Sequence, residues 1–417
     1  MYKLISLTYL LIIFNNNFVL TDFIPTSRWG ANAIYFNNKI YYGGGYLPLY
    51  PDNWRGTQPS NEFFSLDVPP SFNLTDRSKF VWTNLSSQST NLIPFAFSSQ
   101  CLIEDKIMMF GGDFDKYLPP ANTTLVWFYD LSSSSPSWVL TKTTGQPNDL
   151  ESGSLVYNNN TGNIYMWAGK LSNKNTLLTG GASPEDLPTT MNIFNKDTNV
   201  WTSLNLTNAP EGRYDFTSTL LRSGIIVYIG GQLTDANGFA DMSQINMYST
   251  TNDTWLPAMT TGGSYVPSTR ARHTAVLTKD DRIIVYGGHT GTDKPLSDAL
   301  AILNVSQIPF VWTQPNVVTF APSPRTFHTS VLIGDFMIVA FGKSGKYIAS
   351  GSDDLDILDV SDPSEYSWVN SIMPKPNKTN KISTTVTVKS GTTSNYNFVN
   401  FNLSIMVILL VIIQNYL

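Results

Sequence analysis

The sequence has few of the side chains that usually carry catalysis or bind metals. Its 417 residues include one cysteine, Cys101, and three histidines. A single cysteine excludes an intramolecular disulfide, and without cysteine pairs the usual structural zinc sites cannot form. The patterns G-x-S-x-G and H-E-x-x-H, which mark many hydrolases, do not occur. The sequence therefore supports none of these classes, and we expect neither a cofactor nor a bound metal.

Charged residues are also scarce. They make up 14% of the chain, the formal net charge is −5, and the lysines and arginines form no cluster. We expect no nucleic-acid partner, because recognition of nucleic acid needs a basic patch. Long apolar runs lie only at the two ends of the chain, and the segment between them has almost no helical periodicity. This pattern favours an all-β fold.

Both ends of the chain have the composition of targeting segments. In residues 1–20, Lys3 precedes an apolar run from Leu4 to Phe14, which is typical of a secretory signal peptide. Residues 372–397 are rich in Ser, Thr, Asn and Lys and predict a flexible stalk. Residues 398–417 form a hydrophobic tail.

The tail has two interpretations. A GPI-attachment signal needs small residues, a polar spacer and a terminal apolar segment of about 10–20 residues, and Ser390-Gly391-Thr392 begins such an arrangement. A membrane-spanning helix needs about 20 apolar residues, which the tail reaches only by including asparagines and a glutamine. Both interpretations place the protein at the extracellular face of the plasma membrane or in the cell wall. A soluble protein with an apolar end is the third possibility.

Potential glycosylation sites agree with an extracellular location. Asn-x-Ser/Thr sequons are accepted only in the secretory pathway and indicate exposed positions. Eight sequons precede the tail, and they begin at Asn73, Asn84, Asn122, Asn159, Asn205, Asn252, Asn304 and Asn377.

A short β-type run closed by Gly-Gly, or by a variant of it, recurs six times. The copies are KIYYGGG (39–45), KIMMFGGD (106–113), NIYMWAGK (163–170), GIIVYIGGQ (224–232), RIIVYGGH (282–289) and DFMIVAFGK (335–343). The repeated glycines are Gly43, Gly44, Gly111, Gly112, Gly169, Gly230, Gly231, Gly287, Gly288 and Gly342. None of the copies has the glycine spacing of a phosphate-binding loop.

A tryptophan follows each copy at a nearly constant distance. These residues are Trp82, Trp138, Trp201, Trp255, Trp312 and Trp368, separated by 56, 63, 54, 57 and 56 residues. A period of this size indicates an array of supersecondary units. Within each unit, four short apolar or alternating runs divided by turn residues predict four β-strands.

The combination of glycine pairs, Tyr/Phe-Asp or Asn strands and periodic tryptophans resembles the kelch family of β-propellers. The resemblance implies an all-β, six-bladed propeller with four antiparallel strands per blade over residues 21–371. The blades are expected at approximately 25–83, 95–139, 151–202, 213–256, 270–313 and 325–370. Blades 3 and 6 depart from the pattern at Ala168 and Phe341. How the ring closes is left open, and one option is a strand from Asp22–Ile24 that completes the sixth blade.

The resemblance also implies one loop-rich face that could bind a ligand. The longest loop after a glycine pair carries Tyr46, Tyr50, Trp54 and Arg55, and aromatic residues with arginine are favoured at contact sites. The alternative for Trp54 is a local apolar contact with its own blade. The second blade and the fifth add further candidates, which are Asp113, Phe114, Asp115, Tyr117 and His289, the last expected in a loop that could be exposed.

The propeller family includes copper radical oxidases related to galactose oxidase, whose ligands are two tyrosines and two histidines. Here His273 and His328 lie one repeat apart in equivalent inner strands, where a structural role is expected. Cys101 falls in an expected inner strand and is interpreted as a buried, unreactive thiol. The copper ligand set is not visible, so oxidase activity is not expected.

Three functions remain as hypotheses. The first is a non-enzymatic kelch propeller at the cell surface that binds a protein or a glycan through one face, anchored to the membrane by its C-terminus. The second is a secreted galactose-oxidase-like copper radical oxidase. The third is a structural cell-surface or wall protein. The sequence discloses neither the ligand nor the oligomeric state.

Overall fold

The computed structural model describes residues 23–48, 57–88, 91–114, 125–148, 150–171, 186–234, 237–291, 296–344 and 351–373. Residues up to Met373 belong to one compact unit. The expected signal peptide and hydrophobic tail lie outside the described residues, as does the stalk beyond Met373. Within the described ranges, no helix is long and apolar enough to span a membrane.

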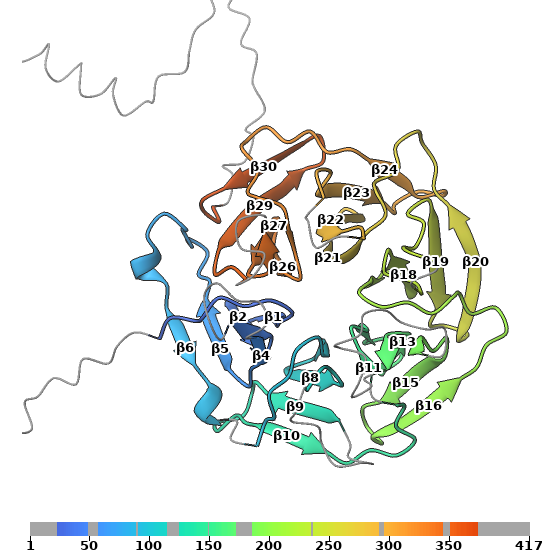
Figure 1. Ribbon diagram of the computed structural model, residues 1–417, viewed down its shortest axis with the longest axis horizontal. Coiled ribbons are helices and arrows are strands. Elements are labelled where there is room, and N and C mark those ends of the chain that lie inside the picture. Colours follow the sequence, from blue (N-terminus) through green and yellow to red (C-terminus); the bar gives the residue numbers. More distant parts are fainter. Residues whose placement is uncertain are drawn as a thin grey trace, which may run out of the picture. The chain divides into compact units, whose positions relative to one another are not determined.

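Six four-stranded antiparallel sheets stand around a central axis, each sheet forming one blade of a β-propeller (Figure 1). The blades, from inner to outer strand, are β1 (Asn32–Phe36), β2 (Lys39–Gly43), β5 (Phe63–Asp67), β6 (Trp82–Asn84); β7 (Ser99–Ile103), β8 (Lys106–Phe110), β9 (Val126–Asp130), β10 (Trp138–Thr141); β12 (Leu155–Asn158), β13 (Asn163–Trp167), β15 (Met191–Asn195), β16 (Val200–Leu204); β17 (Thr217–Leu220), β18 (Ile225–Ile229), β19 (Gln244–Ser249), β20 (Thr254–Thr260); β21 (Ala271–Leu277), β22 (Arg282–His289), β23 (Leu300–Asn304), β24 (Val311–Thr313); and β26 (Thr329–Ile333), β27 (Phe336–Ala340), β29 (Leu355–Asp362), β30 (Glu365–Val369).

Short elements complete the described part of the chain. Three two-stranded ribbons and two single turns of 3₁₀-helix lie outside the blades. They are β3 (Tyr46–Pro48) with β4 (Thr57–Pro59), β11 (Leu150–Glu151) with β14 (Lys170–Leu171), β25 (Arg325–Thr326) with β28 (Lys343–Ser344), η2 (Arg77–Lys79) and η3 (Ser86–Gln88). The all-β, six-bladed architecture predicted from the repeat is confirmed.

Glycines permit the blades to approach one another. At the end of each second strand two successive residues have positive φ, a conformation that disfavours a Cβ atom. A Cβ on Gly287 would lie 2.2 Å from the carbonyl oxygen of Arg325 in the next blade, and one on Gly230 would lie 2.5 Å from that of Arg270. The glycines therefore allow neighbouring backbones to come within hydrogen-bonding distance.

The backbone amide of the second residue in the pair uses this proximity. Gly112 donates to the carbonyl of Leu150 at 3.0 Å, and Gly231 donates to that of Arg270 at 2.9 Å, in each case in the following blade. In blades 3 and 6, Ala168 and Phe341 adopt the same left-handed conformation that the glycines adopt elsewhere. Ala168-Gly169 and Phe341-Gly342 are thus confirmed as the equivalents of the glycine pairs in blades 3 and 6.

In blade 1 the predicted register is wrong by one residue. The left-handed pair is Gly44-Gly45, with φ of +65° and +87°, whereas Gly43 still belongs to β2. The third glycine of this copy concealed the shift. Gly43 stands where the other blades have a side chain, and Phe63 and Phe95 fill the vacated space, each 3.3 Å from where a Cβ would lie.

The periodic tryptophans lie in the fourth strands, as predicted, and those of blades 2 to 6 contact the blade before their own. Trp201 contacts Phe110, Trp255 contacts Trp167, and ring centroids are 5.1 and 5.0 Å apart. In both pairs the partner directly precedes the left-handed pair of the preceding blade. Such aromatic contacts combine large apolar burial with favourable ring geometry.

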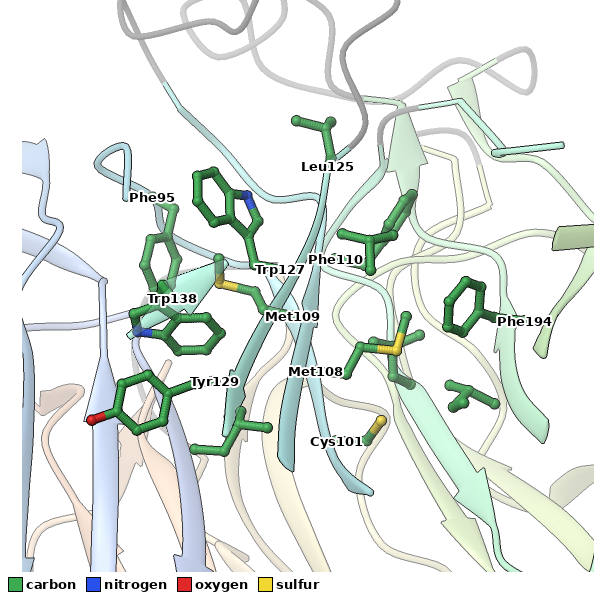
Figure 2. Packing of buried hydrophobic residues seen from close by; sticks show 14 of the residues in the cluster. Phe95, Cys101, Met108, Met109, Phe110, Leu125, Trp127, Tyr129, Trp138 and Phe194 are labelled. Atoms are coloured by element: carbon green, nitrogen blue, oxygen red, sulfur yellow. The ribbon is translucent and has the colours of Figure 1, made fainter. Parts of the chain in front are cut away.

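Trp138 follows the same rule through a substitute partner, because Gly43 has no side chain to offer. It packs on Phe63 at 5.2 Å instead. Figure 2 shows Trp138 between Phe95 and Tyr129, with Met108 on the side of the cluster that faces Phe194. Cys101 lies in the same cluster, and burial raises its thiol pKa well above the usual range, so the expected buried thiol is confirmed.

The ring closes through backbone hydrogen bonds between blades 1 and 6. The predicted option of a strand from Asp22–Ile24 is wrong: β30 already occupies the outer position of blade 6, and the described residues of that segment, Phe23 and Ile24, form no strand. Instead, the amide of Gly342 donates to the carbonyl of Arg28 at 2.9 Å. This is the same hydrogen bond that Gly112 and Gly231 make to the blades that follow their own. Leu74 donates to Asn370 at 2.7 Å on the outer side of the same junction.

Several connections between blades also cover outer strand edges. Thr144, Gly262 and Val317 form parallel bridges with the outer strands of the blades that follow them. Unpaired edges promote aggregation, and covering them is a common protection.

The close approach of neighbouring blades at the glycine pairs can be tested with two matched variants. Gly287→Ala and Gly291→Ala both place a Cβ at positive φ, near +70° and +68°, but only Gly287 has a neighbour within 4 Å. We expect Gly291→Ala to reduce the unfolding free energy by about 1–2 kcal/mol. Gly287→Ala should lose about 1–3 kcal/mol more, because the Arg325 carbonyl must move. Guanidinium unfolding of both variants measures the difference, and equal losses would show that close approach is irrelevant.

Candidate functional site

Six residues around the central axis share an unusual backbone conformation. They lie at the start of the innermost strands, five of them before the strand and Arg272 as the second residue of β21, and they have φ between +53° and +67°. These residues are Gly30, Phe97, Ser152, Asp215, Arg272 and Phe327. Each amide donates to the carbonyl of its counterpart in the preceding blade at 2.9–3.1 Å, and Gly30 closes the circle by donating to Phe327 at 3.0 Å. We call this closed circle the axial ring. Left-handed backbone at non-glycine residues is strained and often accompanies function.

A hollow of about 140 Å³ lies at the axial ring. Its wall includes Phe97, Asp215, Arg272 and Phe327 from the ring, and His273 from the adjoining inner strand. Small-molecule sites usually measure about 300–1,000 Å³. The hollow is therefore suited to one protruding side chain or a similarly small group.

A second tier of residues adjoins the axial ring, and none of its members lines the hollow. In each blade, the residue after the left-handed pair forms an antiparallel bridge with the residue before the axial ring. The pairs are Tyr46–Trp29, Asp113–Ala96, Lys170–Glu151, Gln232–Tyr214, His289–Ala271 and Lys343–Thr326. We call the axial ring together with these six pairs the cup.

One side of the cup is aromatic. Trp29 stacks on Tyr46, with ring centroids 4.6 Å apart, and contacts Phe327 at 5.0 Å and Phe97 at 5.5 Å. The Nζ of Lys343 lies 3.9 Å from the Trp29 ring centroid, within cation–π range. Within the described residues, the indole N–H of Trp29 has no hydrogen-bond acceptor. This side thus combines aromatic rings with a positive charge; Trp29 is half-buried, and Tyr46, Phe327 and Lys343 are largely buried.

The other side of the cup is charged. Arg272 pairs with Asp215 at 2.9 Å, and its guanidinium lies 4.1 Å from the centroid of Phe327. Lys170 lies 3.9 Å from Glu151. These carboxylates and cations neutralise one another, so the cup has mixed polarity without a strong net charge in its described part.

The structure brings some of the predicted site residues together. The hydroxyl of Tyr46 donates to Oδ2 of Asp113, which joins blades 1 and 2. Both residues are buried, as is Phe114. The remaining loop candidates, Tyr50, Trp54, Arg55, Asp115 and Tyr117, lie outside the described residues.

His289 differs from expectation. It was expected in a loop that could be exposed, but it ends β22 and is only 4% exposed. The strand continues through Gly287 and Gly288 because Ala271 offers a pairing partner. The imidazole stacks near Phe327 with ring centroids 6.4 Å apart.

Sequence reasoning missed most of the cup. Trp29, Phe97, Arg272, Phe327 and Lys343 include four residue types, so no motif distinguishes them. Their position in the repeat could have identified them. In each unit one carbonyl accepts the amide of the left-handed pair in the preceding blade, as those of Arg28 and Arg270 do. The axial-ring residue is two residues after the one that carries this carbonyl. Aligning the six units on that position aligns the ring.

His273 and His328 lie beside the hollow in neighbouring blades, in the equivalent positions expected. Nε2 of His273 lies 3.1 Å from Oγ1 of Thr217, and Nε2 of His328 lies 2.8 Å from Oγ1 of Thr274. Burial, reinforced by Arg270, lowers the pKa of His273 to about 3. In the described ranges, no three His, Cys, Asp or Glu side chains are grouped to hold a metal.

Comparison with known proteins gives three findings. A family model described as the KLHDC2/KLHL20/DRC7 Kelch-repeats domain matches residues 163–392, more than half of the chain. The chain is 24% identical over 263 residues to Acyl-CoA-binding domain-containing protein 4 of Arabidopsis thaliana, covering 62% of this chain and 36% of that protein. The solved structure of YjhT superimposes with a TM-score of 0.58 at 14% identity, over 83% of this chain and 98% of that one.

These findings differ in what they support. The chain spans about a third of the length of the Arabidopsis relative, so the functions of that longer protein remain its own. The likeness to YjhT, at 14% identity, shows the fold alone. The family model is the finding that bears on classification.

The buried histidines predict a loss of stability in acid. The unfolded chain takes up a proton near the ordinary pKa of 6.5, whereas folded His273 resists protonation down to about 3. Stability should therefore be full above about pH 6.5 and fall as the pH drops toward 3, by about 2 kcal/mol at pH 5 for this residue. His273→Gln should flatten the dependence by that amount between pH 7 and 5 in guanidinium unfolding. An unchanged slope would contradict a neutral, buried His273.

Proposed function

The chain belongs to the kelch-repeat family, and from that premise we propose that its propeller is a non-enzymatic binding module whose cup receives a protruding part of a protein ligand. The aromatic side of the cup carries the proposal. Trp29, Tyr46 and Phe327 pack as rigid rings beside the ammonium group of Lys343, and Trp29, which is half-buried, is the ring of this group most open to a ligand. Aromatic residues concentrate binding energy at protein interfaces because they bury large area with few rotatable bonds. A glycan is the alternative ligand.

The size and polarity of the cup support a macromolecular ligand. The hollow of about 140 Å³, which is lined by the axial ring and the residues that follow it, takes only a small group, so most of the contact area would come from the second tier and the face around it. The pair Arg272–Asp215 at its edge can exchange hydrogen bonds with a peptide backbone or side chain. Such pairs contribute mainly to specificity and orientation.

A binding role also suits the state of the titratable groups. Asp215 is paired with Arg272 and Glu151 with Lys170. Burial lowers the pKa of His273 and so keeps its imidazole neutral. Burial also encloses this imidazole beneath the axial ring, away from a ligand. We therefore propose no reaction at the cup.

We further propose that the propeller is exported and held at the cell surface. The apolar N-terminal segment 1–20, the apolar tail 398–417 and the sequons support this location. The tail serves as a GPI signal in this proposal, with a single membrane span as the alternative. The propeller would then face the outside, where its ligand is found.

Binding at the cup can be tested with a matched pair of lysines. Lys343→Met keeps the aliphatic stem over Trp29 and removes the charge, whereas Lys279→Met removes an exposed lysine, paired with Asp335, from the turn between β21 and β22. The purified full-length chain is screened against secreted proteins and a glycan array, and the Kd of each hit is measured. We expect Lys343→Met to weaken binding tenfold or more, about 1.4 kcal/mol, and Lys279→Met to leave it unchanged.

The screen also discriminates the ligand classes. Hits confined to glycans would replace the protein ligand by the alternative. Binding that ignores Lys343→Met would move the site away from the cup, and the absence of any hit would favour a purely structural protein.

The proposed anchor predicts enzymatic release from cells. Phosphatidylinositol-specific phospholipase C should release the chain from intact cells, and mass spectrometry should find a modified C-terminus within or near Ser390-Gly391-Thr392. Retention of an intact tail that resists extraction would show the membrane span instead. A chain that surface labelling cannot reach would contradict display altogether.

A further inference from the structure

Strand direction gives the propeller two chemically different faces. The cup lies at the ends where second strands reach their left-handed pairs. The opposite face holds the turns between first and second strands and those between third and fourth strands. Backbone hydrogen bonds of 2.7–3.1 Å tie these two kinds of turn together in five blades, and the donor–acceptor pairs are Val68–Asn38, Leu131–Asp105, Thr250–Gly224, Val305–Asp281 and Val360–Asp335. We call this the turn face.

The described sequons are distributed unevenly between these faces. Asn159 lies in the turn after β12, Asn73 and Asn252 follow the third strands of their blades, and Asn304 ends β23, so all four are on the turn face. Asn84 ends the outer strand β6 and Asn205 follows the outer strand β16, both on the perimeter (Figure 1). Because fourth strands run in the same direction as second strands, these two asparagines lie toward the cup-face side, at its outer edge. None of these six belongs to the cup. Asn122 and Asn377 lie outside the described residues.

Accessibility favours modification at these positions. Five of the six asparagines are exposed, and Asn304 is half-buried. Asn73 also borders a hollow of about 490 Å³ whose wall includes Phe72 and Phe80. The first sugars of a glycan on Asn73 would have space beside the protein surface there.

The side-chain amides provide an independent argument. An N-linked glycan replaces one of the two hydrogens on Nδ2 and places a bulky sugar on that nitrogen, so an asparagine whose Nδ2 is held in a structural hydrogen bond is a poor glycan acceptor. Among the described residues, five asparagines donate from Nδ2 to protein acceptors, namely Asn32, Asn61, Asn158, Asn195 and Asn237. None of these five stands in a sequon.

The sequon asparagines use the other end of the amide. Asn73 accepts from Thr75 through Oδ1 at 2.8 Å, Asn205 from Thr190 at 2.7 Å, and Asn304 from Ser306 at 2.7 Å. In the described part of the chain, no sequon asparagine donates from Nδ2 to a protein acceptor. The sequon asparagines and the asparagines that donate structural hydrogen bonds from Nδ2 are therefore separate sets in the described part of the chain.

We propose that N-linked glycans on Asn73, Asn159, Asn252 and Asn304 cover the turn face, with Asn84 and Asn205 glycosylated at the perimeter, and that the cup face is left open for the ligand. The proposal rests on the export proposed above. Each glycan adds a bulky, hydrated group that excludes other macromolecules from its surroundings. The glycans would therefore impose a single direction of approach on the ligand.

Site occupancy tests the proposal directly. The full-length chain is expressed in a secreting eukaryotic cell, treated with peptide-N-glycosidase F in ¹⁸O-water, and each sequon is quantified by peptide mass spectrometry. We expect Asn73, Asn159 and Asn252 to be modified in more than half of the molecules, with lower occupancy at half-buried Asn304. Occupancy below one molecule in ten at two or more of the four turn-face sites would overturn the glycan cover.

Two adjacent residues supply a matched control. Asn159→Gln should remove one glycan step in gel mobility and leave the Tm unchanged, because its Nδ2 carries no protein hydrogen bond. Asn158→Gln should leave the mobility unchanged and lower the Tm, because Nδ2 of Asn158 donates to Oγ1 of Thr250 at 2.8 Å inside the protein. If both variants keep every glycan step, or if Asn159→Gln is as destabilising as Asn158→Gln, the assignment of Asn159 is wrong.

A gain-of-site variant tests the open cup. Thr290→Asn creates the sequon Asn-Gly-Thr at an exposed position next to His289 of the cup. Glu104→Asn with Lys106→Thr creates its counterpart in the exposed turn between β7 and β8 on the turn face. Glycan at the turn-face site should leave the Kd of a hit from the lysine screen unchanged, whereas glycan at the cup should weaken it tenfold or more. Equal effects would contradict a single open face.

The two proposals can fail separately. Glycans at the turn face together with binding that ignores Lys343→Met would end the proposed cup function and leave the glycan cover standing. Binding that depends on Lys343 in a chain without these glycans would do the reverse.

Discussion

The structure depends on a circle of six backbone hydrogen bonds at the propeller axis. Each blade donates one amide to its predecessor, and the last bond, from Gly30 to Phe327, joins the first blade to the sixth. Five of the six donors are non-glycine residues held in the left-handed conformation, each at a cost of about 1–2 kcal/mol. Because the constraint is imposed on the backbone, it leaves the side chains at these positions free to differ. The ring thereby fixes where Phe97, Asp215 and Arg272 stand without dictating what they are.

Two further sets of contacts, away from the axis, hold neighbouring blades together. Near the cup, glycine pairs let an amide reach the carbonyl of the next blade, as Gly231 reaches Arg270. At the perimeter, a fourth-strand tryptophan such as Trp255 packs against an aromatic residue of the previous blade. The first set needs the absence of a side chain and the second needs a large one. This division explains why the two most visible features of the repeat are its smallest and its largest residues.

The sequence predicted what is repeated and missed what is individual. Six units, four strands in each and a tryptophan in each fourth strand follow from periodicity, because each unit must solve the same packing problem. The register of blade 1 could not be read from three successive glycines, since Gly43 and Gly45 differ only in their three-dimensional surroundings. The same holds for His289, whose burial depends on a pairing partner in β21. The cup escaped notice because its residues come from six distant places and share a position, not a pattern.

The closure of the ring has a consequence for how the chain could be cut. Every blade takes its four strands from one continuous stretch of the chain, and the carbonyl of Arg28 accepts from the amide of Gly342 across the junction just as glycine and carbonyl pair between other neighbours. The described ends of the propeller, near Phe23 and Met373, thus belong to a seam that is structurally like the other five. A circularly permuted chain, with those ends joined by a short linker and new termini opened between two other blades, would contain the same six sheets. The order of the blades in the gene is one of six equivalent ways to write this ring.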